Sequence, residues 1–392
     1  MISRIDLRHF KCFEALKLPV RPLTLLSGGN ASGKSSAMQP LVLLHQTMRE
    51  HEWSSRLMLN GATMRLGTAR EVVDQVHGKR SVHGMRSFEI SLIDNDVDRF
   101  EWEFAGEQDE MSLVVQKVQG DTADHGAWNM DEPQALRCLL PHELGSHPLT
   151  SRLCRLTYLS AERLGPRDYY LYDDPQLTPV VGPRGEYAVS VLHSGSDSRV
   201  LPGLVKDGTP PTRSRQVEAY MHGFFPGCVL DIQPVRRANA VTLGVLVSRD
   251  TDYHRPVHTG FGITQVLPIV IAALSADPQD ILVIENPEVH LHPAGQAAMG
   301  EFLGKVSSAG VQVMVETHSD HVLNGIRRAV KGGVLSSDDV ALHFFSPRSG
   351  ESDSSTPQVQ SPAINSDGNT DSWPAGFFDQ FDNDMNYFAD WG

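Results

Sequence analysis

The stretch LTLLSGGNASGKSS, residues 23 to 36, decides the fold. Its first six residues form an apolar run that predicts a buried strand, and the pattern after it predicts a helix from about residue 34 to 50. Between the two, residues 28 to 35 match the pattern GxxxxGKS. Glycines in this pattern let the backbone curl so that its N–H groups face phosphate oxygens. The stretch therefore predicts a P-loop that binds the phosphates of a nucleotide.

The P-loop predicts the cofactors ATP and Mg²⁺. We expect Lys34 to reach the β- and γ-phosphates and the Ser35 hydroxyl to ligate magnesium. The remaining residues of the loop are predicted to bind the nucleotide through the backbone and their small side chains: Asn30, Ala31, Ser32, Gly33 and Ser36.

The rest of the chain predicts an α/β fold. Residues 2 to 10 alternate apolar and polar side chains, as does the predicted hairpin over 88 to 104, which indicates antiparallel strands. From residue 260 onward strand and helix patterns alternate, which is typical of parallel βαβ units. The expected fold is a P-loop NTPase with a mixed sheet, an antiparallel β subdomain, and an insertion that is partly helical and partly irregular.

Composition divides the chain into five predicted parts. We expect an N-terminal ATPase lobe over 1–120, an insertion over 121–240, and a C-terminal ATPase lobe over 241–346. Residues 347–372 are rich in Ser, Pro, Asp and Gly and are predicted to be a flexible linker. Residues 373–392 contain acids and many aromatic side chains, so we expect this tail to dock on its own body or on a partner.

Charge and cysteine content exclude several classes of protein. The formal net charge of the 392 residues is −14, and no Lys or Arg follows Arg348. Such a chain is a poor indiscriminate DNA binder, although a local basic groove is compatible with this charge. The 4 cysteines are scattered, which supports neither a zinc site nor a disulfide framework. No apolar run is long enough to cross a bilayer, so a cytoplasmic protein with no membrane partner is expected.

Four motifs in a fixed order resemble the ABC-type ATPases. They are the P-loop, TGFGITQ at 259–265, ILVIENPEVHLHP at 281–293, and VMVETHS at 313–319. More narrowly, the chain resembles the RecF, SMC and OLD branch, and within it the short predicted ATPases that lack coiled-coil arms and are found in bacterial defence systems. The resemblance covers roughly residues 1–75 and 255–392.

The resemblance implies a homo-oligomer in which two copies pack head to tail around ATP. The segment GFGITQ stands where transporters have their signature sequence LSGGQ. By this resemblance, Gly262 allows a close backbone approach to the γ-phosphate of the other copy. Thr264 and Gln265 would then add hydrogen bonds to that nucleotide.

The third motif raises a question about catalysis. In the family pattern an Asp binds magnesium and the following Glu handles the attacking water; here Glu285 and Asn286 take these places. Asparagine can orient water but cannot accept a proton, and the loss of a general base costs roughly 10²- to 10⁴-fold in rate. Either Glu288 substitutes as the base, or hydrolysis is slow and the ATP-bound dimer is long-lived. We favour slow hydrolysis with a contribution from Glu288.

Several further residues have weaker assignments. His318 takes the place of the switch histidine that contacts the γ-phosphate in such ATPases. His290 and His292 are expected to be structural, because no third metal ligand is evident. Arg163 and Arg167 are candidates for contacts with phosphate or a partner.

No second catalytic pattern is visible, so the predicted ATPase acts on something else. The favoured prediction is an ATP-hydrolysing switch that controls a separate effector, such as a nuclease, in anti-phage defence. The alternative is a RecF-like DNA-repair ATPase that binds duplex DNA directly in its ATP state. Both hypotheses assign a function to this chain by analogy with the family it resembles.

Overall fold

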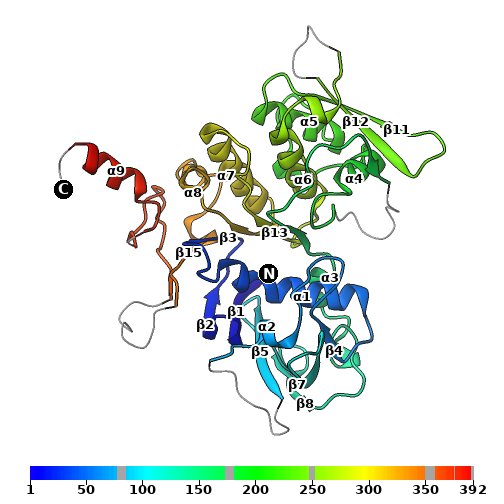
Figure 1. Ribbon diagram of the computed structural model, residues 1–392, viewed down its shortest axis with the longest axis vertical. Helices are drawn as coiled ribbons and strands as arrows, with labels where there is room; N and C mark the ends of the chain where they lie inside the picture. The colour runs from blue at the N-terminus through cyan, green and yellow to red at the C-terminus, as the bar shows by residue number, and fades with distance from the viewer. Residues whose placement is uncertain (77–84, 173–180, 247–251, 349–357, 375, 390–392) are drawn as a thin grey trace. The chain divides into compact units, whose positions relative to one another are not determined.

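The computed structural model describes residues 1–392 apart from 77–84, 173–180, 247–251, 349–357, 375 and 390–392, with the side chains of 380–383 also left out. The chain forms two compact units (Figure 1). Unit 1 consists of Met1–Arg21 and Gly33–Leu156, and unit 2 consists of Pro22–Ser32 and Thr157–Gly392. These boundaries differ from the lobes expected over 1–120, 121–240 and 241–346.

Unit 1 is built on an antiparallel sheet. Its strands lie in the order β2-β1-β5-β6-β7-β4, and β8 pairs with β7 outside this path. The expected hairpin is formed by β5 and β6. The strands are β1 (Ile2–Phe10), β2 (Phe13–Pro19), β4 (Arg56–Met58), β5 (Arg86–Asp94), β6 (Asp98–Gly106), β7 (Ser112–Thr122) and β8 (Gly126–Asp131).

Aromatic side chains fill the core of unit 1. Phe10, Phe88, Phe100, Trp102 and Phe104 are fully buried, as the alternation along these strands requires. The helices of the unit are α1 (Lys34–Glu50), which has the predicted bounds, α2 (Ala69–Val72), η1 (His142–Leu144) and α3 (Pro148–Cys154).

Unit 2 contains a mainly parallel sheet, and one of its strands, β3, leads into the P-loop. Its order is β16-β15-β3-β14-β13-β9, and every neighbouring pair is parallel except β15 with β16. The strands are β3 (Leu23–Gly28), β9 (Thr157–Leu159), β13 (Ile281–Glu285), β14 (Gln312–Glu316), β15 (Val340–Phe345) and β16 (Val359–Gln360). The parallel βαβ pattern expected from the sequence is confirmed.

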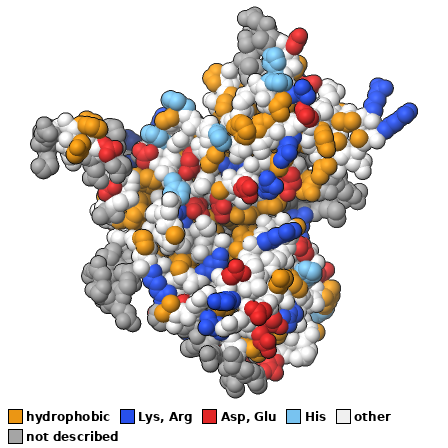
Figure 2. Space-filling view, viewed as in Figure 1, with side chains coloured by type: hydrophobic (Ala, Val, Ile, Leu, Met, Phe, Trp, Pro, Cys, Tyr) orange, Lys and Arg blue, Asp and Glu red, His pale blue; other side chains and the backbone are white. Residues whose placement is uncertain are grey.

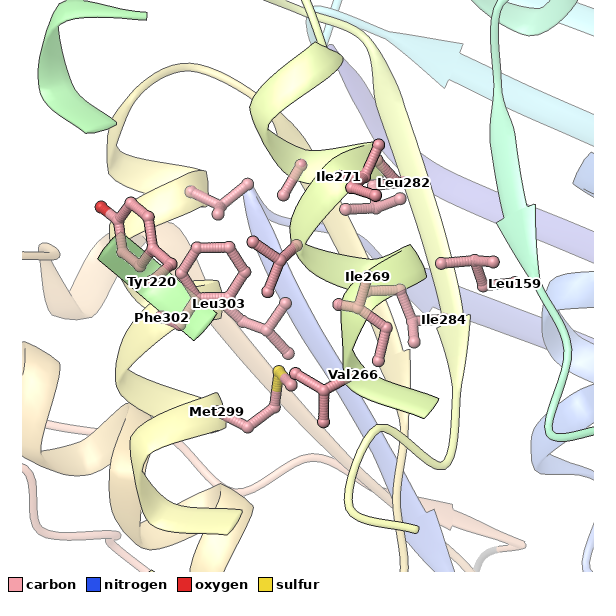
Figure 3. Packing of buried hydrophobic residues seen from close by; sticks show 14 of the residues in the cluster. Leu159, Tyr220, Val266, Ile269, Ile271, Leu282, Ile284, Met299, Phe302 and Leu303 are labelled. Carbon is pink, nitrogen blue, oxygen red and sulfur yellow. The ribbon is translucent and has the colours of Figure 1, made fainter. Parts of the chain in front are cut away.

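The helices that connect these strands are α6 (Phe261–Ser275), α7 (Pro293–Ser308) and α8 (Asp320–Lys331), followed by η5 (Ser337–Asp339). Figure 3 shows how α6 and α7 meet the sheet: Ile269 of α6 lies beside Ile284 of β13, and Leu303 of α7 belongs to the same cluster. Burial of each such side chain contributes roughly 1.5–3 kcal/mol, which holds the strand ends in place.

A second, three-stranded sheet belongs to unit 2. Its order is β10-β12-β11, and its inner face carries Val241, Leu243 and Val245 into the same core. The elements of this region are β10 (Tyr170–Leu171), α4 (Ala188–Ser194), η3 (Pro202–Leu204), α5 (Arg213–Phe224), β11 (Val229–Pro234), β12 (Ala240–Leu246) and η4 (Pro256–His258).

The C-terminal segment packs on unit 2 before its last helix. Phe377 is fully buried, with its ring centroid 5.4 Å from that of Phe344 in β15 and 4.8 Å from that of Trp373. Residues 363–371, inside the predicted linker, form hydrogen-bonded turns, including Ala363 N–H to Asp371 Oδ1 at 2.9 Å. Helix α9 (Gln380–Phe388) follows, and the sequence had not indicated it.

Candidate nucleotide site

Three neighbouring strands of unit 2 end in register at one edge of the sheet. Glu285 at the end of β13 pairs with Glu316 of β14, and Glu316 pairs with Leu26 of β3. The N–H of Thr317 donates to the carbonyl of Leu26 at 3.0 Å. The carboxyl edge of a parallel sheet is where α/β proteins bind ligands, and here it carries the start of the P-loop and two of the predicted catalytic motifs.

The P-loop has the backbone that its glycines predict. Gly28 has φ 140°, and a Cβ on it would lie 2.1 Å from the carbonyl oxygen of Phe345 in β15. Gly33 has φ 105° and stands before α1 at the N-cap position, where it has no side chain to cap the helix. The loop is also held from within, because the Ser32 hydroxyl donates to the carbonyl of Gly29 at 2.8 Å.

The other P-loop residues fall into two groups. Asn30 and Ala31 are exposed at the turn, where Ala31 has φ 57°. Lys34 is buried at the first position of α1, and Ser35 and Ser36 are half-buried after it. The contacts of these residues with ATP stay predictions from the sequence.

Glu285 has two hydrogen-bond partners that the sequence did not predict. The Tyr158 hydroxyl donates to its Oε1 at 2.8 Å, and the N–H of Ala161 donates to its Oε2 at 3.1 Å. Burial, and then the Glu285 charge, raise the pKa of Tyr158, so the phenol stays a donor at every physiological pH. Tyr158 lies within β9 and Ala161 follows that strand, both in the stretch TYLSA, where Tyr158 was the available signal.

Asn286 stands in a left-handed backbone conformation. Its φ is 44°, and its N–H donates to the carbonyl of Glu316 at 2.8 Å. Asparagine tolerates this region better than other residues with a side chain, glycine aside. Its side-chain Oδ1 is buried and has no hydrogen-bond partner among the described residues.

Glu288 connects two of the motifs. Its Oε1 accepts the main-chain N–H of His318 at 2.8 Å, which ties the segment after β13 to the segment after β14. Its other oxygen, Oε2, is buried without a hydrogen-bond partner in the described part of the chain. The side chain of His318 is exposed. Glu288 therefore links the third motif to the fourth, and its part in catalysis stays a prediction.

Arg163 is a central residue of the site whose contacts the sequence did not indicate. Its Nη1 donates to the carbonyls of Ser160 and Glu285 at 3.0 and 2.7 Å, and its Nη2 donates to the carbonyl of Asn286 at 2.6 Å. It is 5% exposed, and burial lowers its pKa to about 10, so it stays charged at neutral pH. Arg167, in contrast, is exposed.

The signature-like helix α6 starts at the turn that Gly260 forms with φ 86°. Thr264 and Gln265 are each 4% exposed: the Thr264 hydroxyl donates to the carbonyl of Phe261, and the Gln265 amide donates to the carbonyls of Arg163 and Leu164. A Cβ on Gly262 would lie 3.0 Å from the carbonyl oxygen of His290. The predicted contacts of Thr264 and Gln265 with a second copy's nucleotide would require these hydrogen bonds to open.

The two histidines of the third motif have structural partners. His292 Nδ1 accepts the N–H of Ala294 and caps α7, and the His290 ring lies 5.4 Å from that of Phe261. No group of three or more potential metal-ligating side chains is found among the residues that the structure describes.

The donor set suits a magnesium ion bound with a nucleotide. Each engaged oxygen of Glu285 keeps a second lone pair for a metal-bound water, and hard oxygen donors are what Mg²⁺ prefers. The buried Oδ1 of Asn286 and Oε2 of Glu288 supply two further oxygens in need of hydrogen-bond donors, such as water. Within unit 2, Glu285 is the residue that would hold the ion, and the role of Ser35 stays a prediction from the sequence.

Two family models match parts of the chain. The model of the AAA ATPase domain matches residues 247–323, which contain three of the four motifs. A second model, that of a family described as a protein of unknown function (DUF3696), matches residues 335–387. A search of curated proteins found no match.

Solved structures of SMC heads share the fold. One, an SMC head bound to the C-terminal winged-helix domain of ScpA, has 13% identity and a TM-score of 0.54 over 93% of this chain and 98% of its own. Another, an SMC head with an extended coiled coil bound to the C-terminal domain of ScpA derived from Pyrococcus furiosus, has 12% identity and a TM-score of 0.54 over 92% and 96%.

The chain therefore shares the fold of these SMC heads, and its residues 247–323 match the AAA ATPase domain. Membership of the ABC-type ATPases, and of their SMC- and RecF-like branch, stays the interpretation that the four motifs gave. Among the described helices, none is both long enough and apolar enough to span a membrane.

Proposed function

We propose that the protein binds ATP and Mg²⁺ between two copies of itself, hydrolyses ATP slowly, and so acts as a switch for a separate effector. The observation that carries this proposal is Asn286 at the position of the usual general base, held with its side chain in the site. Without a strong base, hydrolysis loses roughly 10²- to 10⁴-fold in rate, and the ATP-bound state persists.

Glu288 is the residue that would supply the remaining hydrolysis. Its Oε2 is buried and lacks a hydrogen-bond partner among the described residues, while its Oε1 is held by His318 N–H. A carboxylate with one oxygen anchored and one available can accept a proton from a positioned water.

ATP turnover of the parent, Asn286→Glu and Glu288→Gln tests the switch, with light scattering to follow ATP-dependent dimerisation. We expect a slow parent, a faster Asn286→Glu, and a Glu288→Gln that is slower still. A parent that turns over rapidly and stays monomeric with ATP would contradict the proposal.

The effector is proposed to be a nuclease in anti-phage defence, docked by helix α9. Support comes from the exposure of this helix: Met385, Tyr387 and Phe388 are 52, 79 and 78% exposed, and acids flank them. A tagged nuclease encoded beside this protein, co-expressed with it, should be retained by the parent and lost by Tyr387→Ser/Phe388→Ser. Retention by both would exclude α9 as the docking element.

Direct DNA binding is the alternative, and surface charge bears on it. Figure 2 shows that acidic and basic side chains are interspersed over the face in view. Indiscriminate binding to duplex DNA needs many Lys and Arg facing the phosphates. Stimulation of turnover by duplex DNA, lost with rising salt, would favour the RecF-like alternative over the effector switch.

A further inference from the structure

Arg163 holds the two peptide groups that flank Asn286. Its guanidinium donates to the carbonyl of Glu285 and to the carbonyl of Asn286, at 2.7 and 2.6 Å. Each carbonyl oxygen lies in the plane of its peptide group, and the two planes are linked only through the φ and ψ angles of Asn286. Holding both oxygens therefore restrains both angles, and with them the direction of the Cα–Cβ bond of Asn286.

Arg163 is itself held by a residue of the signature-like helix α6. Gln265 of α6 donates its side-chain amide to the carbonyls of Arg163 and Leu164, at 3.3 and 3.4 Å. Both Gln265 and Arg163 are buried, at 4 and 5% exposure, where hydrogen bonds are stronger than in water and costly to leave unmade. A continuous line of contacts thus runs from α6 through Arg163 to Asn286.

We infer that Arg163 is a positioning residue that couples the signature-like helix α6 to the hydrolysis site by setting the backbone of Asn286. A displacement of α6 reaches Asn286 because Gln265 holds the main chain of Arg163, and the Arg163 guanidinium in turn holds the carbonyls on both sides of Asn286. This inference deepens the proposed function and rests on it, since it assigns the control of ATP hydrolysis to contacts within one copy.

The first test measures hydrogen exchange of backbone amides and needs no ATP. Hydrogen exchange of the amides of Glu285, Asn286 and Glu288 should accelerate in Arg163→Gln and in Gln265→Met, because the peptide planes lose their restraint. Gln216→Met is the matched control: Gln216 is fully buried and also donates to two carbonyls, those of Thr209 and Pro210, but it lies on α5. The control should leave exchange at 285–288 unchanged.

The second test separates positioning from binding. In single-turnover assays Arg163→Gln should lower the rate constant of hydrolysis by up to roughly 100-fold, with the affinity for ATP kept. Arg163→Lys, which keeps the charge but not the two-pronged geometry, should recover only part of the rate. Gln265→Met should lower the rate too, and the double variant should be no slower than Arg163→Gln alone.

Each outcome decides the inference. If Arg163→Gln does not fold, Gln265→Met still carries both measurements. Unchanged exchange at 285–288 in Gln265→Met, or rate losses that multiply in the double variant, would overturn the coupling. A parent that shows no hydrolysis at all would instead refute the proposed function, while the exchange result would still report whether the contacts restrain Asn286.

Discussion

The hydroxyl of Tyr158 donates a 2.8 Å hydrogen bond to Oε1 of Glu285, the acid that ends β13. Tyr158 belongs to β9, which pairs in parallel with β13, so two neighbouring strands deliver donor and acceptor to one point. The contact orients the carboxylate that would bind magnesium. Removal of an outer partner of this kind typically lowers metal affinity by roughly 10- to 100-fold.

Tyr158→Phe should therefore raise the magnesium concentration that half-activates ATP turnover by about tenfold. Fluorescent ATP binding in EDTA should not change, because the hydroxyl acts on the metal ligand alone. Tyr170→Phe, another buried tyrosine of unit 2, is the control. An unchanged magnesium dependence in Tyr158→Phe would show that Glu285 does not bind the ion.

The left-handed backbone of Asn286 predicts an order of stability among variants. Asn286→Gly should be as stable as the parent, whereas Asn286→Ala should lose about 1 kcal/mol of the free energy of unfolding, because alanine tolerates the left-handed region at φ 44° less well than asparagine or glycine does. Urea denaturation measures both. Equal stability of the two variants would mean that this residue leaves the left-handed region in solution.

The same pair of variants separates backbone from side chain in catalysis. Neither glycine nor alanine can orient a water, so both should turn over ATP more slowly than the parent. If Asn286→Gly matches the parent rate, the asparagine amide has no part in hydrolysis.

Lys34→Ala should remove measurable ATP binding in calorimetry, because the buried start of α1 then loses its only side chain able to neutralise phosphate charge. ATP-dependent dimerisation should disappear with it. Lys17→Ala, an exposed lysine of unit 1, serves as the control. Full ATP affinity in Lys34→Ala would refute the P-loop assignment.

Unit 1 should lose stability in mild acid through His45. This histidine is 1% exposed, donates from Nδ1 to the Leu153 carbonyl at 2.7 Å, and has its pKa lowered by burial to about 4. The unfolded chain, with a pKa near 6.5, binds more protons between these values, so the free energy of unfolding falls as pH falls. Between pH 6.5 and 5 the loss should be about 1.5 kcal/mol.

The variant His45→Asn tests this origin, since an asparagine amide can donate to the same carbonyl without titrating. Its free energy of unfolding, measured in urea, should change much less over the same pH range. A parent-like slope in this variant would assign the acid sensitivity to other groups.

The C-terminal tail should separate into a structural and a dispensable part. A chain ending at residue 372 lacks the fully buried Phe377. Its free energy of unfolding should be lower by about 3–5 kcal/mol, as for a Phe→Ala substitution in a protein core. A chain ending at 378 keeps this residue and should have the parent's urea midpoint. Equal midpoints for both truncations would show that Phe377 does not support the fold.

Local patterns in the sequence determined most of the elements and the order of the motifs. The strand 23–28, the helix 34–50 and the alternation after residue 260 each carry a periodicity of their own, and glycine at 28 and 33 marks backbone that a side chain would obstruct. The acidic helix α9 has too few residues for a clear periodic signal, and the sequence did not reveal it.

Tertiary structure alone decided what the site residues touch. Tyr158 and Arg163 lie more than a hundred residues before Glu285 and Asn286, and only the parallel pairing of β9 with β13 brings them together. Likewise, the sequence shows only that Asn286 replaces the usual general base. The structure adds that its backbone is left-handed and that Arg163 donates to its carbonyl. A motif specifies residue types along the chain, but hydrogen bonds between distant strands depend on register, which only the packed sheet defines.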